Sequence, residues 1–173
     1  MGMITFLTVN VPGSNNNLGR TPEMDIEWAD RLAADLDWIA QGFASARRAD
    51  SRGIVIIWQG NPRFERQPDD NLAYAPLLEA LEEEVRAFAR PVLLVHGDTH
   101  YFRVDKPLPP GSPPGRGARG RNRVDNFTRL ETFGEPDHHW VSITVDYTDP
   151  GFFLIRQKIV EKNRGCGAPP SPC

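Results

Sequence analysis

Residues 92–100 read VLLVHGDTH, a short apolar run that changes abruptly into polar residues around Gly97. Consecutive apolar residues without polar alternation are typical of a strand that is covered on both faces, as in a parallel sheet. The polar residues after such a strand lie at the carboxyl edge of the sheet, where open α/β folds bind ligands. This stretch therefore predicts both the fold class and the position of a site.

Two earlier segments predict further strands of the same sheet. Residues 4–11 (ITFLTVNV) are rich in β-branched residues and end at Pro12-Gly13. Residues 54–58 form a second apolar run directly after Gly53. Each of these segments has the length of a strand and is followed by a polar loop, which favours parallel neighbours of residues 92–95.

Helical patterns separate these strands. Thr21 before Pro22 is a favoured helix start, and apolar residues then recur at three- to four-residue spacing as far as about Asp50. Residues 74–89 carry a second apolar stripe, which ends before Pro91. The alternation of strand, helix, strand, helix and strand predicts an α/β fold with a parallel βαβαβ unit.

The second half of the chain has a different composition. Residues 107–123 (PLPPGSPPGRGARGRNR) have nothing to bury and are predicted to form a mobile loop. Residues 126–133, 140–147 and 152–160 resemble strands separated by turn signals, which predicts an antiparallel meander. We thus expect one domain over residues 1–160 and a disordered tail over residues 161–173.

The bulk composition narrows the functional classes. A formal net charge of -3 gives no reason to expect a nucleic-acid partner, although residues 107–123 contain several arginines. No apolar run approaches the roughly 20 residues of a membrane span. The first ten residues lack the pattern of a signal peptide, so the chain as written is expected in the cytoplasm. Cys166 and Cys173 predict neither a disulfide framework nor a zinc knuckle.

Candidate ligand-binding residues follow two of the predicted strands. Asp98 and His100 are two residues apart, so a bend at Gly97 could present a carboxylate and an imidazole to one cation. A hydrogen-bonded turn explains the same residues equally simply. Asn15 lies in the loop GSNNN, whose amides could bind an oxyanion or satisfy the backbone of a turn.

The stretch HGDTHYF after an apolar strand resembles the Gly-His-x-His ending of calcineurin-like metallophosphoesterases. The stretch VNVPGSNNN resembles a segment of uncharacterised bacterial members of that superfamily, and the resemblance covers about residues 4–160. The resemblance covers only the C-terminal half of the family's domain. The fold that it implies is a partial αββα sandwich.

The resemblance also assigns residues by position. His100 matches the second histidine of the final motif, while Asp98 stands where the first histidine is expected, and Gln59 occupies the position of a lone histidine ligand. These three residues would bind divalent metal ions. Asn61, in the turn before Pro62, and Asn15 would contact the substrate, although Asn61 could also simply cap its loop.

The function implied by the resemblance is metal-dependent hydrolysis of a phosphoester. A dinuclear site needs many anionic or imidazole ligands, and the first ligands of the family have no counterpart in this chain. We therefore expect an N-terminally truncated, inactive form whose dinuclear site forms only if the missing half is supplied. The substitutions at Asp98 and Gln59 keep open an alternative, a non-catalytic binding module. An unpaired sheet edge would in either case favour self-association.

Overall fold

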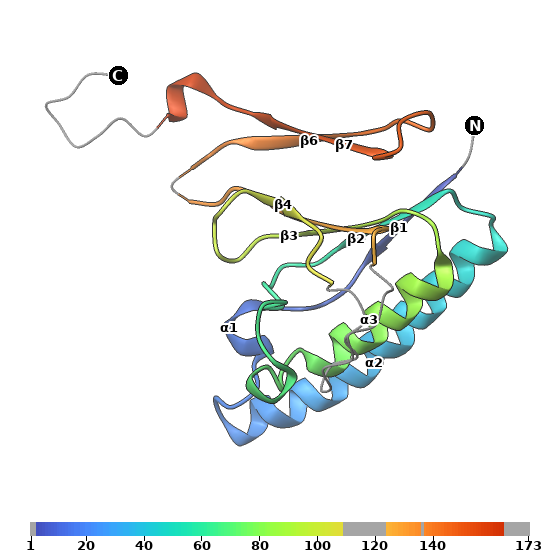
Figure 1. Cartoon of the computed structure of the whole chain (residues 1–173). Helices are drawn as coiled ribbons and strands as arrows, with labels where there is room; N and C mark the ends of the chain where they lie inside the picture. Colours follow the sequence, from blue (N-terminus) through green and yellow to red (C-terminus); the bar gives the residue numbers. More distant parts are fainter. Residues whose placement is uncertain (1–2, 109–123, 136, 165–173) are drawn as a thin grey trace, which may run out of the picture.

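The computed structural model describes residues 3–108, 124–135 and 137–164. Three layers stack on one another: two long helices, a five-stranded sheet and a two-stranded sheet (Figure 1). The strands are β1 (Ile4–Thr8), β2 (Gly53–Ile57), β3 (Val92–His96), β4 (Arg103–Asp105), β5 (Phe127–Glu131), β6 (Trp140–Val145) and β7 (Phe153–Lys158). The helices are α1 (Gly13–Asn16), α2 (Pro22–Arg48) and α3 (Ala75–Phe88), with short 3-10 turns η1 (Pro68–Asp70) and η2 (Glu161–Asn163).

The larger sheet has the strand order β1-β2-β3-β5-β4. Strands β1, β2, β3 and β5 are parallel, and β4 runs antiparallel to β5 at the far edge. The predicted α/β class with a parallel sheet is therefore confirmed. Among the described residues, no helix combines the length and apolar character that crossing a membrane requires.

The expected antiparallel meander is wrong for residues 126–133. Strand β5 joins the larger sheet parallel to β3, so of the three strands expected in the meander only β6 and β7 pair antiparallel with each other. Because Arg129 and Glu131 alternate with an apolar residue, the sequence of β5 is typical of a half-exposed strand. Both charged residues are nevertheless buried, and both form ion pairs. Partners on other elements thus allow a charged sequence to occupy an interior position. The short edge strand β4 was not expected from the sequence.

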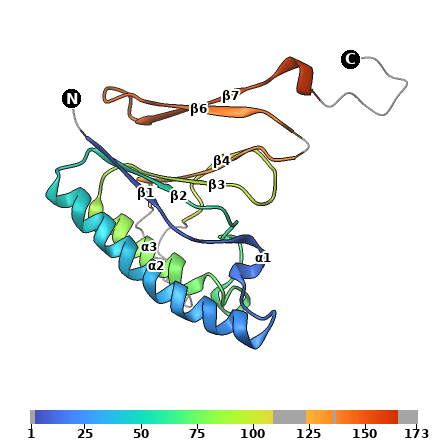
Figure 2. The same ribbon diagram turned by 180° about the vertical axis from the view of Figure 1, so that it is seen from behind.

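Local signals explain where the helices begin and end. The Thr21 hydroxyl accepts a hydrogen bond from the Met24 N–H at 3.2 Å, and Pro22 occupies the first turn of α2. Helix α3 ends at Ala89, which has a left-handed backbone with φ 54°, two residues before Pro91. Figure 2 shows both helices on one face of the sheet, with α2 beneath the outer strand β1.

Two apolar cores hold the layers together. The first lies between the helices and the larger sheet and includes Ile39, Phe43, Leu81 and Phe88. The second lies on the opposite face of the sheet, where Val55, Leu93 and Leu130 pack against Phe152 and against Phe153, the first residue of β7. The central strands are therefore covered on both faces, as their uninterrupted apolar sequences require.

Two expectations fall partly outside the described residues. Of the predicted mobile loop, residues 109–123 are not described, and the flanking Leu108 and Val124 are buried. Of the expected tail, residues 165–173 are not described, whereas η2 occupies Glu161–Asn163.

Candidate functional site

The loops after β1, β2 and β3 meet at the carboxyl edge of the sheet. Backbone hydrogen bonds connect them, because the Gly60 N–H donates to the Val11 carbonyl at 2.7 Å and the Gly97 N–H to the Gln59 carbonyl at 3.1 Å. Gly60 approaches the first loop so closely that an added Cβ would lie 2.5 Å from the Pro12 carbonyl oxygen. The edge is thus a tightly joined set of three loops.

Three of the residues predicted to form a site come together at this edge. The Asp98 carboxylate accepts a hydrogen bond from the Asn61 N–H at 2.9 Å, and the Gln59 amide oxygen accepts one from the Gly13 N–H. The Asp98 carboxylate also lies against Gly13, since an added Cβ there would be 2.5 Å from its Oδ1 atom. Asp98 and Gln59 therefore share Gly13 as a neighbour.

His100 has different neighbours from Asp98. Its Nδ1 atom lies 2.5 Å from the Glu135 carbonyl oxygen, and its ring packs against Gly134. Both Asp98 and His100 have left-handed backbones, with φ of 85° and 69°, so the loop bends between them. Within the described ranges no three His, Cys, Asp or Glu side chains cluster as a metal site would require. The residues that the structure describes do not by themselves fit a dinuclear centre.

The first loop forms an unusual left-handed turn. Ser14, Asn15, Asn16 and Asn17 all have positive φ, a conformation that costs about 1–2 kcal/mol per ordinary residue and less for asparagine. The amide of Asn15 bonds the Leu18 carbonyl at 2.8 Å, and that of Asn16 bonds the Ala73 carbonyl at 3.0 Å. The asparagines thus stabilise the turn through their own side chains, as one of the two interpretations of GSNNN expected.

Arg31 on α2 holds the same turn from below. Its guanidinium donates to the side-chain oxygen of Asn16 at 2.7 Å, to the Asn16 carbonyl at 3.0 Å and to the Asn10 carbonyl at 3.1 Å. Glu27 pairs with the outer side of the same guanidinium. The sequence showed Arg31 only as a helix residue, so its contact with the loop depends on tertiary packing.

Arg63 is the main site residue that the sequence did not indicate. Its Nη1 atom donates to the Asn15 side-chain oxygen at 3.0 Å, and its backbone N–H donates to the Asn61 side-chain oxygen at 3.0 Å. The guanidinium lies 6.0 Å from the centre of the Tyr74 ring. Arg63 thereby joins both asparagines that were predicted to contact the substrate. Its place directly after Asn61-Pro62 was the only available signal.

A buried carboxylate holds the loop that carries Asp98. Glu131 is fully buried and accepts hydrogen bonds from the Thr99 hydroxyl, the Thr99 N–H and, at 2.6 Å, the Arg103 guanidinium. His96 lies opposite Glu131 across the β3–β5 pair. Burial lowers the pKa of His96 below its usual value of 6.5, so its neutral form is favoured. The charge network below the loop fixes the position of Thr99 and thus the approach to Asp98.

No protein-family model, curated protein or solved structure matches this chain. The chemistry of the edge therefore rests on the residues that the fold brings together there.

The carboxyl group of Asp35, next to Arg31, gives a test of electrostatics below the turn. Burial raises the pKa of Asp35 above its usual 3.8, while the Asn10 N–H and Arg31 oppose the shift. The folded pKa of Asp35 exceeds the unfolded one, so the protonated carboxyl group favours the folded state. Its contribution to stability is complete below about pH 3.8 and decreases as the pH rises through the folded pKa.

We expect Asp35→Asn to have a higher melting temperature than the wild type at neutral pH and a similar one at about pH 3. Thermal unfolding followed by circular dichroism measures both values. Asp30→Asn, at an exposed position on the same helix, is the matched control and should change little at either pH. A variant that is less stable than the wild type at neutral pH would show that the ionised carboxylate stabilises the fold.

Proposed function

We propose that this chain supplies one edge of a metal-dependent phosphoester hydrolase site, as its resemblance to calcineurin-like metallophosphoesterases implies. The observation that supports the proposal best is the convergence of Asp98, from the loop after β3, with Gln59 and Asn61, from the loop after β2, at the carboxyl edge of a parallel sheet. Such an edge is where α/β folds place their ligands. The partial αββα sandwich belongs to the same proposal.

The residues at the edge divide into two chemical groups. Asp98 is the anionic group among them, and a carboxylate is a ligand that hard divalent cations prefer. Asn15, Asn61 and Arg63 are neutral or cationic and lie in one hydrogen-bonded set, which suits the oxygens of a phosphoryl group. When bound, divalent metal ions would supply an activated water for hydrolysis.

The described residues alone hold too few ligands for two metal ions, so the proposal requires further ligands from outside them. His100 would have to turn away from the Glu135 carbonyl to take part. We accordingly expect the chain by itself to hydrolyse no phosphodiester. The role that remains for it is to place a carboxylate, three side-chain amides and a guanidinium at one side of the reacting group.

Manganese titration of the isotopically labelled chain, followed by NMR, tests this role. Even weakly bound Mn²⁺ broadens nearby resonances, so we expect broadening to concentrate at residues 59–61 and 97–99. Asp98→Ala should abolish that broadening, whereas Glu83→Ala, at an exposed acidic position on α3, should retain it. Broadening that does not affect residues 59–61 and 97–99, or that persists in Asp98→Ala, would contradict the proposal.

A hydrolysis assay with bis(p-nitrophenyl) phosphate and Mn²⁺ complements the titration. The chain alone is expected to give no turnover above the rate of the buffer with metal. Turnover that is lost in Asp98→Ala would instead show that the chain already holds a complete site.

One observation favours the alternative of a non-catalytic binding module. Both Asp98 and Gln59 already accept hydrogen bonds from backbone N–H groups of neighbouring loops, so their oxygens also have a structural role. A purely structural role predicts that Mn²⁺ leaves the edge unaffected and that Asp98→Ala lowers thermal stability. The same titration therefore separates the two functions.

A further inference from the structure

The outer edge of the larger sheet is open at β1. Strand β1 is the terminal strand of the order, and its residues ITFLT include no charge and no proline, the usual features that prevent edge strands from pairing. The Met3 carbonyl and the Val9 N–H bond toward β2. Because successive residues of a strand alternate in direction, the backbone groups of Ile4, Phe6 and Thr8 face outward.

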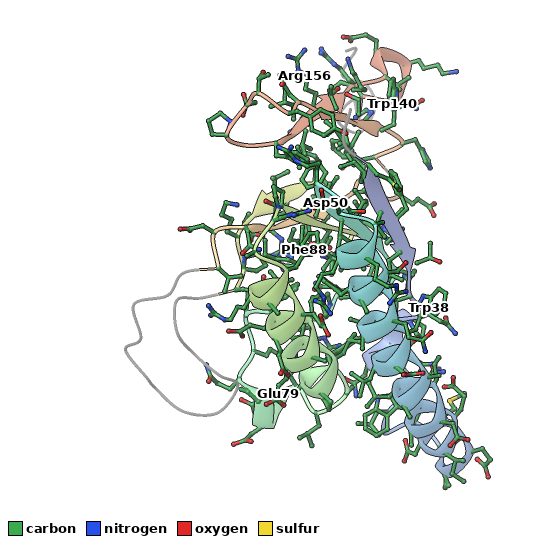
Figure 3. The ribbon with its side chains drawn as sticks, turned by 90° about the vertical axis from the view of Figure 1, so that its right-hand side faces the viewer. Trp38, Asp50, Glu79, Phe88, Trp140 and Arg156 are labelled. Atoms are coloured by element: carbon green, nitrogen blue, oxygen red, sulfur yellow. The ribbon has the colours of Figure 1, made fainter. Side chains whose placement is uncertain are left out.

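One of these outward groups already has a partner. The indole N–H of Trp38 donates to the Thr8 carbonyl at 2.8 Å. The stretch that can accept a new strand is therefore centred on Phe6, whose side chain is 68% exposed. Trp38 is itself 50% exposed and projects from α2 on the side away from α3 (Figure 3). Both residues line a groove of about 370 Å³ between β1 and α2.

The exposed face of α2 beside this groove is self-complementary in charge. Asp37, Gln41, Ser45 and Arg48 are all exposed and follow one another at spacings of four, four and three residues, so they form one stripe. Gln41, Ser45 and Arg48 line the groove itself. Asp37 accepts a hydrogen bond from the Gln41 amide at 2.7 Å, which places its carboxylate at the same rim.

The two charged residues at the ends of the stripe, Asp37 and Arg48, lie at nearly equal distances along the helix from Gly42. Asp37 lies five residues before Gly42 and Arg48 lies six residues after it, and the two carry opposite charges. Within the part of the chain that the structure describes, neither has an ion-pair partner. A second, antiparallel copy of the stripe would therefore place a cation opposite each anion.

We infer that two copies of this chain associate through this edge, with β1 antiparallel to β1 of the second copy and a two-fold axis passing near Phe6 and Gly42. A Cβ added at Gly42 would lie 2.8 Å from the Leu7 side chain, so Gly42 lies directly against the residue that follows Phe6. A single axis can therefore serve both the strand and the helix. A two-fold interface requires that one surface complement itself, which this stripe does.

The arrangement makes specific contacts. The Phe6 N–H of each copy donates to the Phe6 carbonyl of the other, which continues the sheet across the axis. Asp37 of each copy then faces Arg48 of the other. An unrelated strand could satisfy the backbone of β1, but it would leave the symmetric placement of Asp37 and Arg48 unused. The inference is independent of the proposed phosphoester chemistry.

Sedimentation velocity of the full chain over a concentration series tests the association. The expected result is a species with twice the 19.4 kDa mass of one chain. Phe6→Lys should give monomers, because a lysine on an edge strand opposes pairing. A chain that stays monomeric at every concentration overturns the inference.

A charge exchange tests the geometry. Asp37→Arg alone and Arg48→Asp alone should each weaken the dimer by roughly tenfold, since two exposed ion pairs become two repulsive contacts. The double variant D37R/R48D should restore the wild-type dissociation constant, and Glu83→Arg on α3 should leave it unchanged. Because all three positions are exposed, far-UV circular dichroism should match the wild type. Single variants that dimerise normally, or a double variant that stays as weak as the single ones, overturn the inference.

Discussion

Phe43→Ala is expected to lower the free energy of unfolding by about 3–5 kcal/mol. Phe43 lies on α2, is fully buried and meets the ring of Phe88 on α3 edge to face, with 5.9 Å between ring centres and 82° between planes. The substitution removes this aromatic contact and leaves a cavity where both helices pack against the sheet. The loss is large because close-packed neighbours can collapse only partly into the space.

Urea denaturation followed by far-UV circular dichroism measures this effect. Ile26→Ala removes apolar atoms from the same helix at a position that is 65% exposed, and should change the free energy by less than about 0.5 kcal/mol. A loss below about 1 kcal/mol for Phe43→Ala would mean that the contact between α2 and α3 contributes little to the fold.

Arg129→Ala is expected to be similarly destabilising, by about 2–5 kcal/mol, chiefly because a long buried side chain is lost. The Arg129 side chain is 1% exposed, and its guanidinium donates to Asp105 at 2.8 Å and to Glu65 at 2.7 Å. It also lies 5.2 Å from the centre of the Phe64 ring. Its removal both leaves a space beside Phe64 and takes a cation away from Asp105 and from Glu65, of which Glu65 keeps Arg103 as a partner.

The pH dependence of this loss separates the charge from the volume. Burial would raise the pKa of Glu65, but the hydrogen bond and charge of Arg129 bring it below the usual 4.5. Stability from the ionised carboxylate is therefore present above about pH 4.5 and is lost as the pH falls through the lower folded pKa. The difference between the wild type and Arg129→Ala should thus shrink in acid.

Arg129→Met is the matched control, because it retains much of the volume but not the charge. Urea denaturation at neutral pH and at about pH 3 measures the free energy of unfolding of both variants. At each pH, Arg129→Met should lose less of it than Arg129→Ala. If Arg129→Met is as stable as the wild type and the loss in Arg129→Ala does not depend on pH, the ion pairs of Arg129 contribute nothing measurable.

Much of the fold could be predicted from local patterns. The apolar runs at residues 54–58 and 92–95 became β2 and β3, and the helix start at Thr21 matches the beginning of α2. These signals are local, since burial on both faces and capping act within a few residues of the chain. Strand β5 could not be placed in this way. Its charged residues are compatible with burial only because Asp105, Glu65 and Arg103 lie beside them.

The candidate site was predicted in part. Asp98, Gln59 and Asn61 do share the carboxyl edge, because parallel strands end at the same side of a sheet. His100 follows a bend in the backbone and meets Glu135, a contact that its spacing from Asp98 does not reveal. The binding of metal ions and of a phosphoester by these residues stays a prediction.

The sequence by itself determined the strands that are buried on both faces, the two long helices and the loop ends where polar residues collect, because each depends on the chemistry of neighbouring residues. Tertiary structure decided which of those polar residues meet. Arg31 and Arg63 reach the asparagine loop, Glu131 holds Thr99, and the Asp98 and His100 side chains diverge. Such contacts join residues that are far apart in the chain or separated by a bend, so the VLLVHGDTH stretch could indicate the edge but not its arrangement.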